Sequence, residues 1–447
     1  MSDSTSNPIS IAIIGGGLAG ISLANALIRH PHLRIQVFEA APQFSERGAA
    51  VGLSTNAQRA LDEVLGGSAE EALERAGAVS MNPMRMMVAS GKAAGSLVAD
   101  IKGISPPKVV HRASLLRELL SPLPSEILHA NKKLASLQHD SNAESGSGGV
   151  TVSFQDGHIE RFDAVIGADG IFGSVRRHVL VNDDQESRGR ATAEASPAGF
   201  WDCRNIVPFE KAVAALGAET FEVDRQNIWM GDGAIVLHDV LENRTLVQCI
   251  VSAIEDKDEN LESRGRATPL TRERLKGVLG KWRDRRFADG IADLILDQQD
   301  PKAYSQYHHK ATPTYANGRL CIVGDAAHAT TPWQGSGAGL AIEDAMVLGA
   351  LLSETTSPDG LESAFKAFDA VRRPRCNRVV DSSQRTGEIS TGQDQELGLD
   401  EPEKLRAALM PRWAFIIGLD VKEHQLEALE VLRGIREGDP GGMAGGF

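Results

Sequence analysis

Residues 11–27, IAIIGGGLAGISLANAL, decide the fold of this chain. The apolar, largely β-branched run at residues 9–14 ends in glycines, which favours a short buried strand of a parallel sheet. Beyond Gly20 the apolar residues recur with helical spacing, and residues 33–38 have the pattern of a second strand. The stretch therefore predicts a strand–helix–strand unit of about thirty residues, the building block of parallel α/β sheets.

Three glycines stand at the predicted turn between strand and helix, and an acidic residue ends the second strand. Gly15, Gly17 and Gly20 have the G-x-G-x-x-G spacing, and Glu39 follows about twenty residues further on. Glycines here let the backbone approach a pyrophosphate at the helix N-terminus, where free N–H groups and the helix dipole attract negative charge. Glu39 would accept hydrogen bonds from a ribose. The pattern predicts a dinucleotide site, and the alternative is a glycine-rich turn that binds nothing.

Two later stretches also have the pattern of a strand that runs into a glycine-containing turn. Residues 318–346, GRLCIVGDAAHATTPWQGSGAGLAIEDAM, read as a buried strand, a turn with Asp325, a glycine-rich loop and a helix. Residues 150–180 show a hairpin signal at residues 156–157 and then a strand that ends at Asp169. Asp169 belongs either to an ordinary turn or to a cofactor groove. The open question is whether the chain binds two nucleotides or binds one from two sides.

Composition and charge exclude several classes of protein. The 447 residues are 42% hydrophobic and 24% charged, which is ordinary for a soluble globular protein. The net charge of -13 argues against a nucleic-acid-binding surface, which needs a basic footprint. The one dense basic run, residues 372–375, is expected on a solvated helix face. The first ten residues lack a signal-peptide pattern and no apolar segment is long enough to span a membrane, so we expect a cytoplasmic protein.

The cysteines give no sign of a metal centre or a disulfide framework. Cys203, Cys249, Cys321 and Cys376 lie far apart and have no paired ligand spacing. We therefore expect no metal site and a reducing compartment.

The three motifs, in this order and at these separations, resemble those of single-component FAD-dependent aromatic hydroxylases, the group A flavoprotein monooxygenases. Within this group the motifs resemble those of salicylate hydroxylase and of the fungal phenolic-polyketide hydroxylases of secondary metabolism. The resemblance rests on the first glycine motif with Glu39, on GADGIFGSVRR at residues 167–177 and on residues 318–346. It implies that both glycine-rich turns hold one FAD, the first at the adenosine and pyrophosphate end and the second at the ribityl and flavin end.

The fold that the resemblance implies is α/β, with a Rossmann-like FAD-binding domain, a second, sheet-based substrate domain and a helical C-terminal region. The patterns agree, because residues 200–254 read as β-sheet with a hairpin at residues 242–244, and the chain beyond residue 361 has mostly helical spacing. Residues 141–149 and 183–196 read as loops, and the terminal GGMAGGF as a frayed tail. We predict FAD-binding segments at residues 1–80, 105–185 and 301–360, substrate-domain segments at 81–104 and 186–300, and the helical region at 361–447.

The resemblance also implies which residues contact FAD in the second turn and around it. Asp325 would meet the ribityl chain or the pyrophosphate, and a helix beginning near Gly337 and Ala338 would aim its N-terminal dipole at the anionic reduced flavin. Gly52 is expected as a backbone position beside the flavin. Arg112 is expected to reach the cofactor, with an ordinary surface arginine at a helix start as the alternative.

Two positions depart from the pattern of the family. Thr55 stands where proline is frequent, which leaves the shape of that loop open. Trp333 stands where salicylate hydroxylases tend to have histidine, which leaves salicylate open as the substrate. His328, just after the second turn, is expected to pack or hydrogen-bond near the cofactor rather than to do chemistry.

The implied chemistry is hydroxylation of a small phenolic aromatic substrate. NADH or NADPH reduces FAD, molecular oxygen adds to form a flavin hydroperoxide, and this species transfers oxygen to an electron-rich ring. A cation or base beside the substrate oxygen would favour the reactive phenolate. Arg204 is expected to bind that phenolate, with a solvent-facing strand arginine as the alternative. His238 is the second catalytic candidate because imidazole takes up a proton near neutral pH, with a core histidine as the alternative.

Other functions stay open from the sequence. The product could be a hydroxylated phenol or the dearomatised product of a phenolic aldehyde. A non-catalytic binding module with the same fold is one alternative of another class, and a nicotinamide-dependent dehydrogenase is a second. The second turn with Asp325 argues against both, since neither needs it. We expect no nucleic-acid partner and either a monomer or a homodimer.

Overall fold

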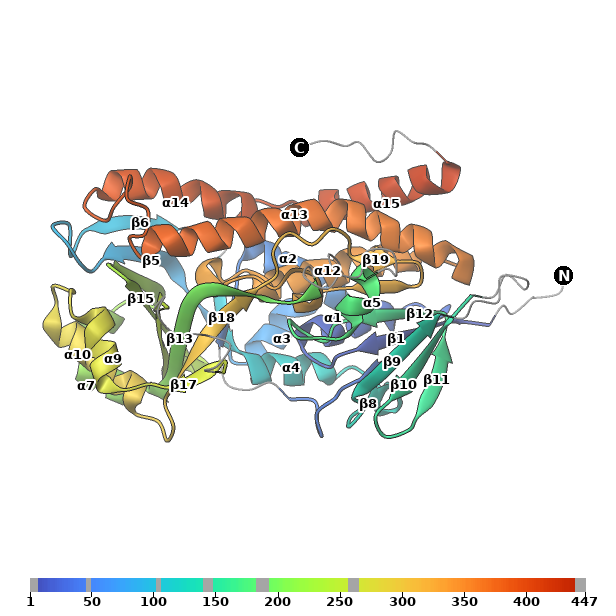
Figure 1. Cartoon of the computed structure of the whole chain (residues 1–447), viewed down its shortest axis with the longest axis horizontal. Helices are drawn as coiled ribbons and strands as arrows, with labels where there is room; N and C mark the ends of the chain where they lie inside the picture. The colour runs from blue at the N-terminus through green and yellow to red at the C-terminus, as the bar shows by residue number, and fades with distance from the viewer. Residues whose placement is uncertain are drawn as a thin grey trace.

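The computed structural model describes residues 7–45, 50–101, 106–139, 148–181, 193–255 and 265–438 of the chain. The predicted loops at residues 141–149 and 183–196 lie largely outside the described residues, and the terminal GGMAGGF lies wholly outside them. Figure 1 shows β-sheets at both ends of an elongated molecule and three long C-terminal helices that run along one side of it.

A six-stranded sheet is built around β1 (Ile9–Ile14), the strand predicted from the opening motif, and all six residues of β1 are buried. The strands lie in the order β19 (Ala316–Asn317), β20 (Leu320–Ile322), β12 (Ala164–Gly167), β1, β2 (Leu33–Phe38) and β8 (Leu128–His129). β1 pairs in parallel with β2 and β12, and Ile14 is in register with both Phe38 and Gly167. The carboxyl ends of these strands therefore meet at one edge of the sheet, where an α/β fold places its ligands.

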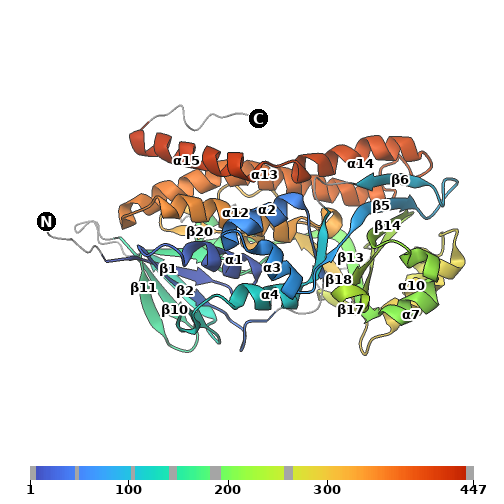
Figure 2. The same ribbon diagram turned by 180° about the vertical axis from the view of Figure 1, so that it is seen from behind.

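Helices and a small antiparallel sheet cover this parallel sheet. The helices are α1 (Leu18–Leu27), α2 (Thr55–Leu65), α3 (Ala69–Arg75), α4 (Arg112–Leu120), α5 (Val175–Leu180), α11 (Asp325–His328) and α12 (Gly337–Ser353). α1 follows β1 directly and packs against α12 (Figure 2), and nearly all its residues are buried. The antiparallel strands are β9 (Leu134–His139), β10 (Val150–Phe154) and β11 (Ile159–Phe162), with the predicted hairpin at residues 156–157. The predicted Rossmann-like α/β class is confirmed.

An eight-stranded sheet lies at the other end of the molecule (Figure 1). Its order is β17 (Ala267–Pro269), β18 (Lys302–His308), β13 (Ser196–Pro208), β16 (Leu246–Ile254), β15 (Ala234–Leu241), β14 (Arg225–Gly231), β5 (Asn82–Val88) and β6 (Leu97–Ile101). The sheet predicted in residues 200–254 is confirmed, and the turn at residues 242–244 joins β15 to β16. One face packs on α7 (Phe209–Leu216), α9 (Arg272–Leu279) and α10 (Arg285–Leu296). The division of the chain into separate domains stays a prediction.

A three-stranded sheet joins the two large sheets. It consists of β3 (Ala50–Leu53), β7 (Lys108–His111) and β4 (Val79–Ser80). Leu53 and Val110 belong to the hydrophobic core of the six-stranded sheet, whereas Val79 and Val109 belong to the core under the eight-stranded sheet. Because neighbouring residues of β7 enter different cores, this small sheet holds the two large ones together.

The predicted helical C-terminal region is confirmed as α13 (Leu361–Ser390), α14 (Pro402–Ile417) and α15 (Val421–Glu437). α13 has 30 residues and is therefore about 45 Å long, enough to reach from the first sheet to the second. α15 packs on α12 and α13, and α14 packs on β6 (Figures 1 and 2). The short 3₁₀ helices are η1 (Ser125–Ile127), η3 (Ala218–Phe221), η4 (Glu242–Arg244), η5 (Pro332–Gln334) and η6 (Pro358–Gly360). Among the described residues, no helix has both the length and the apolar character needed to cross a membrane.

The prediction that the basic run at residues 372–375 lies on a solvated helix face is corrected, because two of its arginines are buried or nearly so. Arg372 is fully buried and donates to Glu343 at 2.7 Å and to Asp344 at 2.8 Å, both on α12. Arg375 donates to the two oxygens of Glu343 at 2.8 Å each. Burial works to raise the pKa of Glu343, but the charges of Arg372 and Arg375 outweigh it and hold that pKa at about 2.

Replacing Arg372 by leucine should strongly destabilise the protein, because Glu343 and Asp344 would lose the buried cation that binds them both. We expect a loss of about 3–5 kcal/mol, measured as the shift in the free energy of unfolding in urea. The matched control is Arg373→Leu, one residue further along, whose pair with Asp369 lies near the surface and should contribute about 0–1 kcal/mol. Equal losses in the two variants would contradict a special role for the buried arginine.

Candidate functional site

A cavity of about 420 Å³ lies between the two large sheets and is the candidate site. One wall is formed by the turns that follow β1, β12 and β20, including Gly17, Gly170 and Asp325. The opposite wall is a face of the eight-stranded sheet, and the end of α14 closes part of the rim. Segments that are far apart in the sequence therefore share one ligand-sized space.

The first glycine turn is shaped by close backbone contacts. Gly15 has a φ of 117°, and a Cβ there would lie 2.2 Å from the carbonyl oxygen of Ala168 on the neighbouring strand turn. A Cβ on Gly20 would lie 2.0 Å from the carbonyl oxygen of Gly15. Only glycine fits at either position, and the turn brings Gly17, the residue before α1, to the cavity wall.

Glu39 holds the first turn from the end of β2. Its carboxylate accepts hydrogen bonds from the backbone N–H groups of Gly16 and Ala41, both at 2.7 Å. The side chain is half-buried and lies beside the glycine turn, as predicted from its spacing. Each carboxylate oxygen has a further lone pair, so Glu39 can accept a ribose hydroxyl in addition to these bonds.

The second glycine turn places an acid and a helix N-terminus on the same cavity. Asp325 is exposed to the cavity and makes no hydrogen bond to another described residue. The loop from Thr330 continues along the wall to Gly337 and Ala338, the first residues of α12. α1 and α12 both begin without a side-chain cap and without an acid in the first turn. Two helix N-termini thus offer free N–H groups and positive dipole ends to one cavity, an arrangement that suits a phosphate-containing ligand.

Gly52 and Arg112 also line the cavity, and their contacts with the cofactor stay predictions. Gly52 lies on β3, and no atom stands within 4 Å of the place where its Cβ would be, so the space beside it is open. Arg112 is the first residue of α4 and reaches the same wall. Asp169 is different, because its carboxylate accepts from the backbone N–H groups of Ser174 and Val175 and caps the start of α5. Its neighbours Ala168 and Gly170 line the cavity but Asp169 does not, and its contact with the cofactor stays a prediction.

The two catalytic candidates lie on opposite faces of the eight-stranded sheet. Arg204 on β13 lines the cavity, and its guanidinium donates to Asp202 at 2.6 Å. His238 on β15 points the other way, into the core beside Phe221 and Phe287. Burial lowers the pKa of His238 to about 4, so the ring is neutral at pH 7. His238 does not line the cavity, and its catalytic role stays a prediction.

Polar residues that the sequence analysis missed share the cavity face with Arg204. Asp239, the residue after His238, lines the cavity and is flanked by Gln226 on β14 and Gln248 on β16. The signal that could have found them is strand alternation, because β15 has buried residues on both faces and every second one faces the cavity. Alternation places Asp239 on the same face as Leu237, but it does not say which face meets the cavity, since both faces carry apolar residues.

Trp333, which stands where salicylate hydroxylases tend to have histidine, lies in η5 on the cavity wall. It is buried, and its ring meets Phe200 edge-on at 4.7 Å between centroids. Trp333 therefore contributes an apolar surface to the site.

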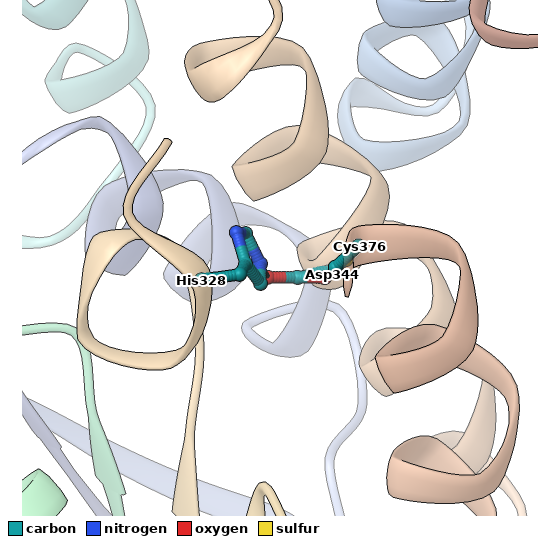
Figure 3. Close-up of side chains that lie close together, drawn as sticks. All are labelled: His328, Asp344 and Cys376. Carbon is teal, nitrogen blue, oxygen red and sulfur yellow. Dashed lines mark hydrogen bonds and ion pairs between the residues drawn. The ribbon is translucent and has the colours of Figure 1, made fainter. Parts of the chain in front are cut away.

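Figure 3 shows His328, Asp344 and Cys376 pointing toward one another from α11, α12 and α13. Asp344 already accepts from His328 at 2.6 Å, from the Gly324 backbone N–H at 2.8 Å and from Arg372. Burial works to lower the pKa of His328, but the charge of Asp344 outweighs it and raises that pKa well above its ordinary value. The contacts of Asp344 with His328, Arg372 and the Gly324 backbone form a buried polar cluster that anchors the second turn, and the absence of a metal there stays a prediction.

Comparison with known proteins agrees with this geometry. Residues 9–383 match the family described as FAD binding domain. The chain is 31% identical to 6-methylsalicylate 1-monooxygenase atA of Aspergillus terreus, over 97% of this chain and 94% of that protein. It is 32% identical to a salicylate hydroxylase of Pseudomonas putida, over 88% of each chain.

Solved structures show the same fold. A salicylate hydroxylase substrate complex has a TM-score of 0.77 and 24% identity, and the match covers 94% of this chain and 98% of that one. CtdE in complex with FAD and a substrate has a TM-score of 0.79 and 17% identity, over 96% of this chain and 100% of that one. The predicted cofactor, FAD, and the predicted class, FAD-dependent monooxygenase, are confirmed by the family match and the curated relatives.

Asp325→Ala should lose FAD while the protein stays folded. The carboxylate faces the cavity and makes no hydrogen bond to another described residue. Its removal therefore takes away a cofactor contact without breaking a hydrogen bond within the described part of the protein. The measurement is FAD released per chain by denaturation, with circular dichroism as the check on folding. Wild type should release one FAD, and Asp359→Ala, which changes an exposed acid that does not line the cavity, is the control. An Asp325 variant that held FAD as tightly as wild type would exclude this contact.

Glu39→Ala should weaken FAD binding without changing the chemistry of the FAD that remains bound. A charge-assisted hydrogen bond to the ribose contributes about 1.5–3 kcal/mol, which is about one to two decades in the dissociation constant. Titration of the apoprotein with FAD measures that constant. Turnover per bound FAD should stay near the wild-type value, and a large drop at saturating FAD would place Glu39 at the reacting end of the cofactor.

Proposed function

This chain belongs to the FAD binding domain family, and from that premise we propose that it is a monooxygenase that hydroxylates a phenolic aromatic substrate with NADH or NADPH and molecular oxygen. The names of the curated relatives, a 6-methylsalicylate 1-monooxygenase and a salicylate hydroxylase, support a phenolic substrate. A salicylate-like ring and a phenolic polyketide are the two candidate substrates.

The observation that carries this proposal is that the cofactor wall and an arginine-bearing sheet face enclose the same cavity. Gly52 and the start of α12 lie on one side, and Arg204 lies on the other. Between them, aliphatic side chains such as Ile228 and Ile250 line the space. An aromatic ring fits against such a surface, and Arg204 offers a permanent positive charge to an oxygen of that ring.

Each part of the cavity has a separate task in this reaction. FAD, when bound and reduced, supplies the oxygen-transfer chemistry. The N-terminus of α12 stabilises negative charge on the ring system of the cofactor. Arg204 holds the substrate oxygen as phenolate and fixes the orientation of the ring, while Asp202 holds the guanidinium in place. Trp333 and the end of α14 exclude water from the space between.

Product identification tests the reaction type. Phenols should be screened for stimulated oxidation of NADH and NADPH, with chromatography and mass spectrometry of the products. A product with one added oxygen and an intact ring supports hydroxylation, whereas loss of aromaticity from a phenolic aldehyde would support hydroxylative dearomatisation. Nicotinamide oxidation with no oxygenated product from any phenol would contradict both.

Arg204→Ala should retain FAD but hydroxylate poorly near neutral pH. Without the guanidinium, the pKa of the bound phenol rises, because the phenolate loses its opposite charge. Activity should therefore return partly as the pH rises toward the pKa of the free phenol, and Arg204→Lys should lie between the two. The measurement is product formation against pH, with FAD content determined for each variant.

Asp202→Asn is the matched control for the Arg204 variants. Asp202 is buried and pairs with Arg204, so Arg204→Ala also leaves this carboxylate without its partner. The double variant, which combines Asp202→Asn with Arg204→Ala, removes both charges. If Arg204 acts on the substrate, product formation by this double variant should have the same pH dependence as in Arg204→Ala. Wild-type product formation in the double variant would mean that the single variant failed only because of the unpaired acid, and would remove Arg204 from the active site.

A further inference from the structure

Asp239 lies on the substrate-facing sheet together with Arg204 and Asp202, and the proposed hydroxylation assigns it no role. Its side chain lines the cavity but is only 1% exposed. One carboxylate oxygen accepts from Gln226 at 2.8 Å and the other from Gln248 at 3.2 Å. Among the described residues, no cation pairs with this carboxylate. Burying a carboxylate that has only two neutral amides as partners costs desolvation free energy. A contact between the carboxylate and a ligand in the cavity would offset that cost.

The orientation of one amide is determined by the backbone. The Ala50 backbone N–H, on β3, donates to the side-chain oxygen of Gln248 at 2.9 Å, so the Gln248 NH₂ group must point toward Asp239. Gln226 has no such constraint and can turn its amide over. The carboxylate oxygens each retain a lone pair that neither glutamine fills, and the cavity is the open direction.

The register of the sheet places Asp239 close to Arg204 but not in contact with it. Arg204, Ile250 and Leu237 stand opposite one another across β13, β16 and β15. Gln248 and Asp239 form the adjacent row, two residues along the strands. A single aromatic ring can therefore direct one substituent toward the arginine and a second toward the aspartate.

The charges that line this part of the cavity disfavour a second anion. The sheet face carries one cation, Arg204, and two acids, Asp202 and Asp239. Arg204 is already paired with Asp202, so a ring carboxylate near Asp239 would meet a like charge in a buried place. A hydroxyl at the same position would find an acceptor.

We propose that Asp239 determines substrate specificity by accepting a hydrogen bond from a hydroxyl group on the substrate ring. The preferred substrate class is then a ring with two hydroxyl groups, one held as phenolate by Arg204 and one donating to Asp239. A ring whose second substituent is a carboxylate is disfavoured. This inference rests on the proposed phenol hydroxylation and on the same cavity.

The preference should depend on pH because burial raises the pKa of Asp239 to about 7. The groups that face Asp239 from β14, β16 and β3 are uncharged: Gln226, Gln248 and the Ala50 backbone. On the remaining neighbours, Lys108 of β7 pairs with Glu70, Arg204 of β13 pairs with Asp202, and the Cys249 thiol lies on the opposite face of β16. Repulsion of a ring carboxylate is therefore present above about pH 7, where Asp239 is ionised, and is lost below it.

The test measures binding, with oxidised FAD-loaded enzyme and no reductant, by the change in flavin absorbance. The probes are two matched pairs, catechol with salicylate and resorcinol with meta-hydroxybenzoate. In at least one pair, wild type should bind the diol about tenfold more tightly than the hydroxybenzoate, and Asp239→Asn should reduce that ratio to near one. The introduced amide can be accommodated because Gln226 can turn its own amide over. Asp232→Asn, an exposed acid paired with Lys281, should leave the ratio unchanged.

Any of three outcomes would overturn the inference. The ratio of affinities could be unchanged in Asp239→Asn, wild type could bind both hydroxybenzoates more tightly than the diols, or no probe could bind at all. If Asp239→Asn does not fold, the wild-type ratio measured from about pH 6 to about pH 8 decides, because it should rise with pH and a constant ratio contradicts the role of Asp239. Product formation is assayed separately. Diol-selective binding with no hydroxylated product would reject the proposed reaction alone, and hydroxylation with an unchanged ratio would reject the inference alone.

Discussion

Two acids buried side by side on α12 share one buried arginine. Arg372 reaches from α13 to both Glu343 and Asp344, and all three side chains are fully buried. Such charges are stable only together, because each would be left in a low-dielectric interior without the others. The same Asp344 binds the Gly324 backbone and His328, so the network also anchors the second glycine turn. The cofactor wall of the cavity therefore depends on the C-terminal helices, which contribute few of its lining residues.

The substrate wall is preorganised in the same way, by pairing polar groups before a ligand arrives. Asp202 orients Arg204, and two glutamines orient Asp239. Gln248 is itself held by the Ala50 backbone of β3, the strand that also carries Gly52. The small sheet between the two large ones thus links the shape of the substrate face to the wall beside the flavin. Groups fixed in advance lose little entropy when the substrate binds.

Much of the cofactor half of the site could be predicted from the sequence, because its motifs are local. Gly15, Gly17 and Gly20 are close together in the sequence and therefore lie in one turn. Glu39 follows the adjacent strand and binds that turn. Asp169 shows the limit of this reasoning. A strand that ends in Asp-Gly has the same pattern whether the acid lines a groove or caps the next helix, and here it caps α5.

The sequence by itself determined the strand–helix–strand unit, the two glycine turns and the class of cofactor, since turn geometry and helix N-termini depend on residues close together in the chain. Only the tertiary structure decided which face of β15 meets the cavity, and so placed Asp239 there and His238 in the core. It also decided that Arg372 is buried, because its partners on α12 are about thirty residues away. Burial and charge pairing are properties of contacts between distant segments, and a single sequence does not show which segments meet.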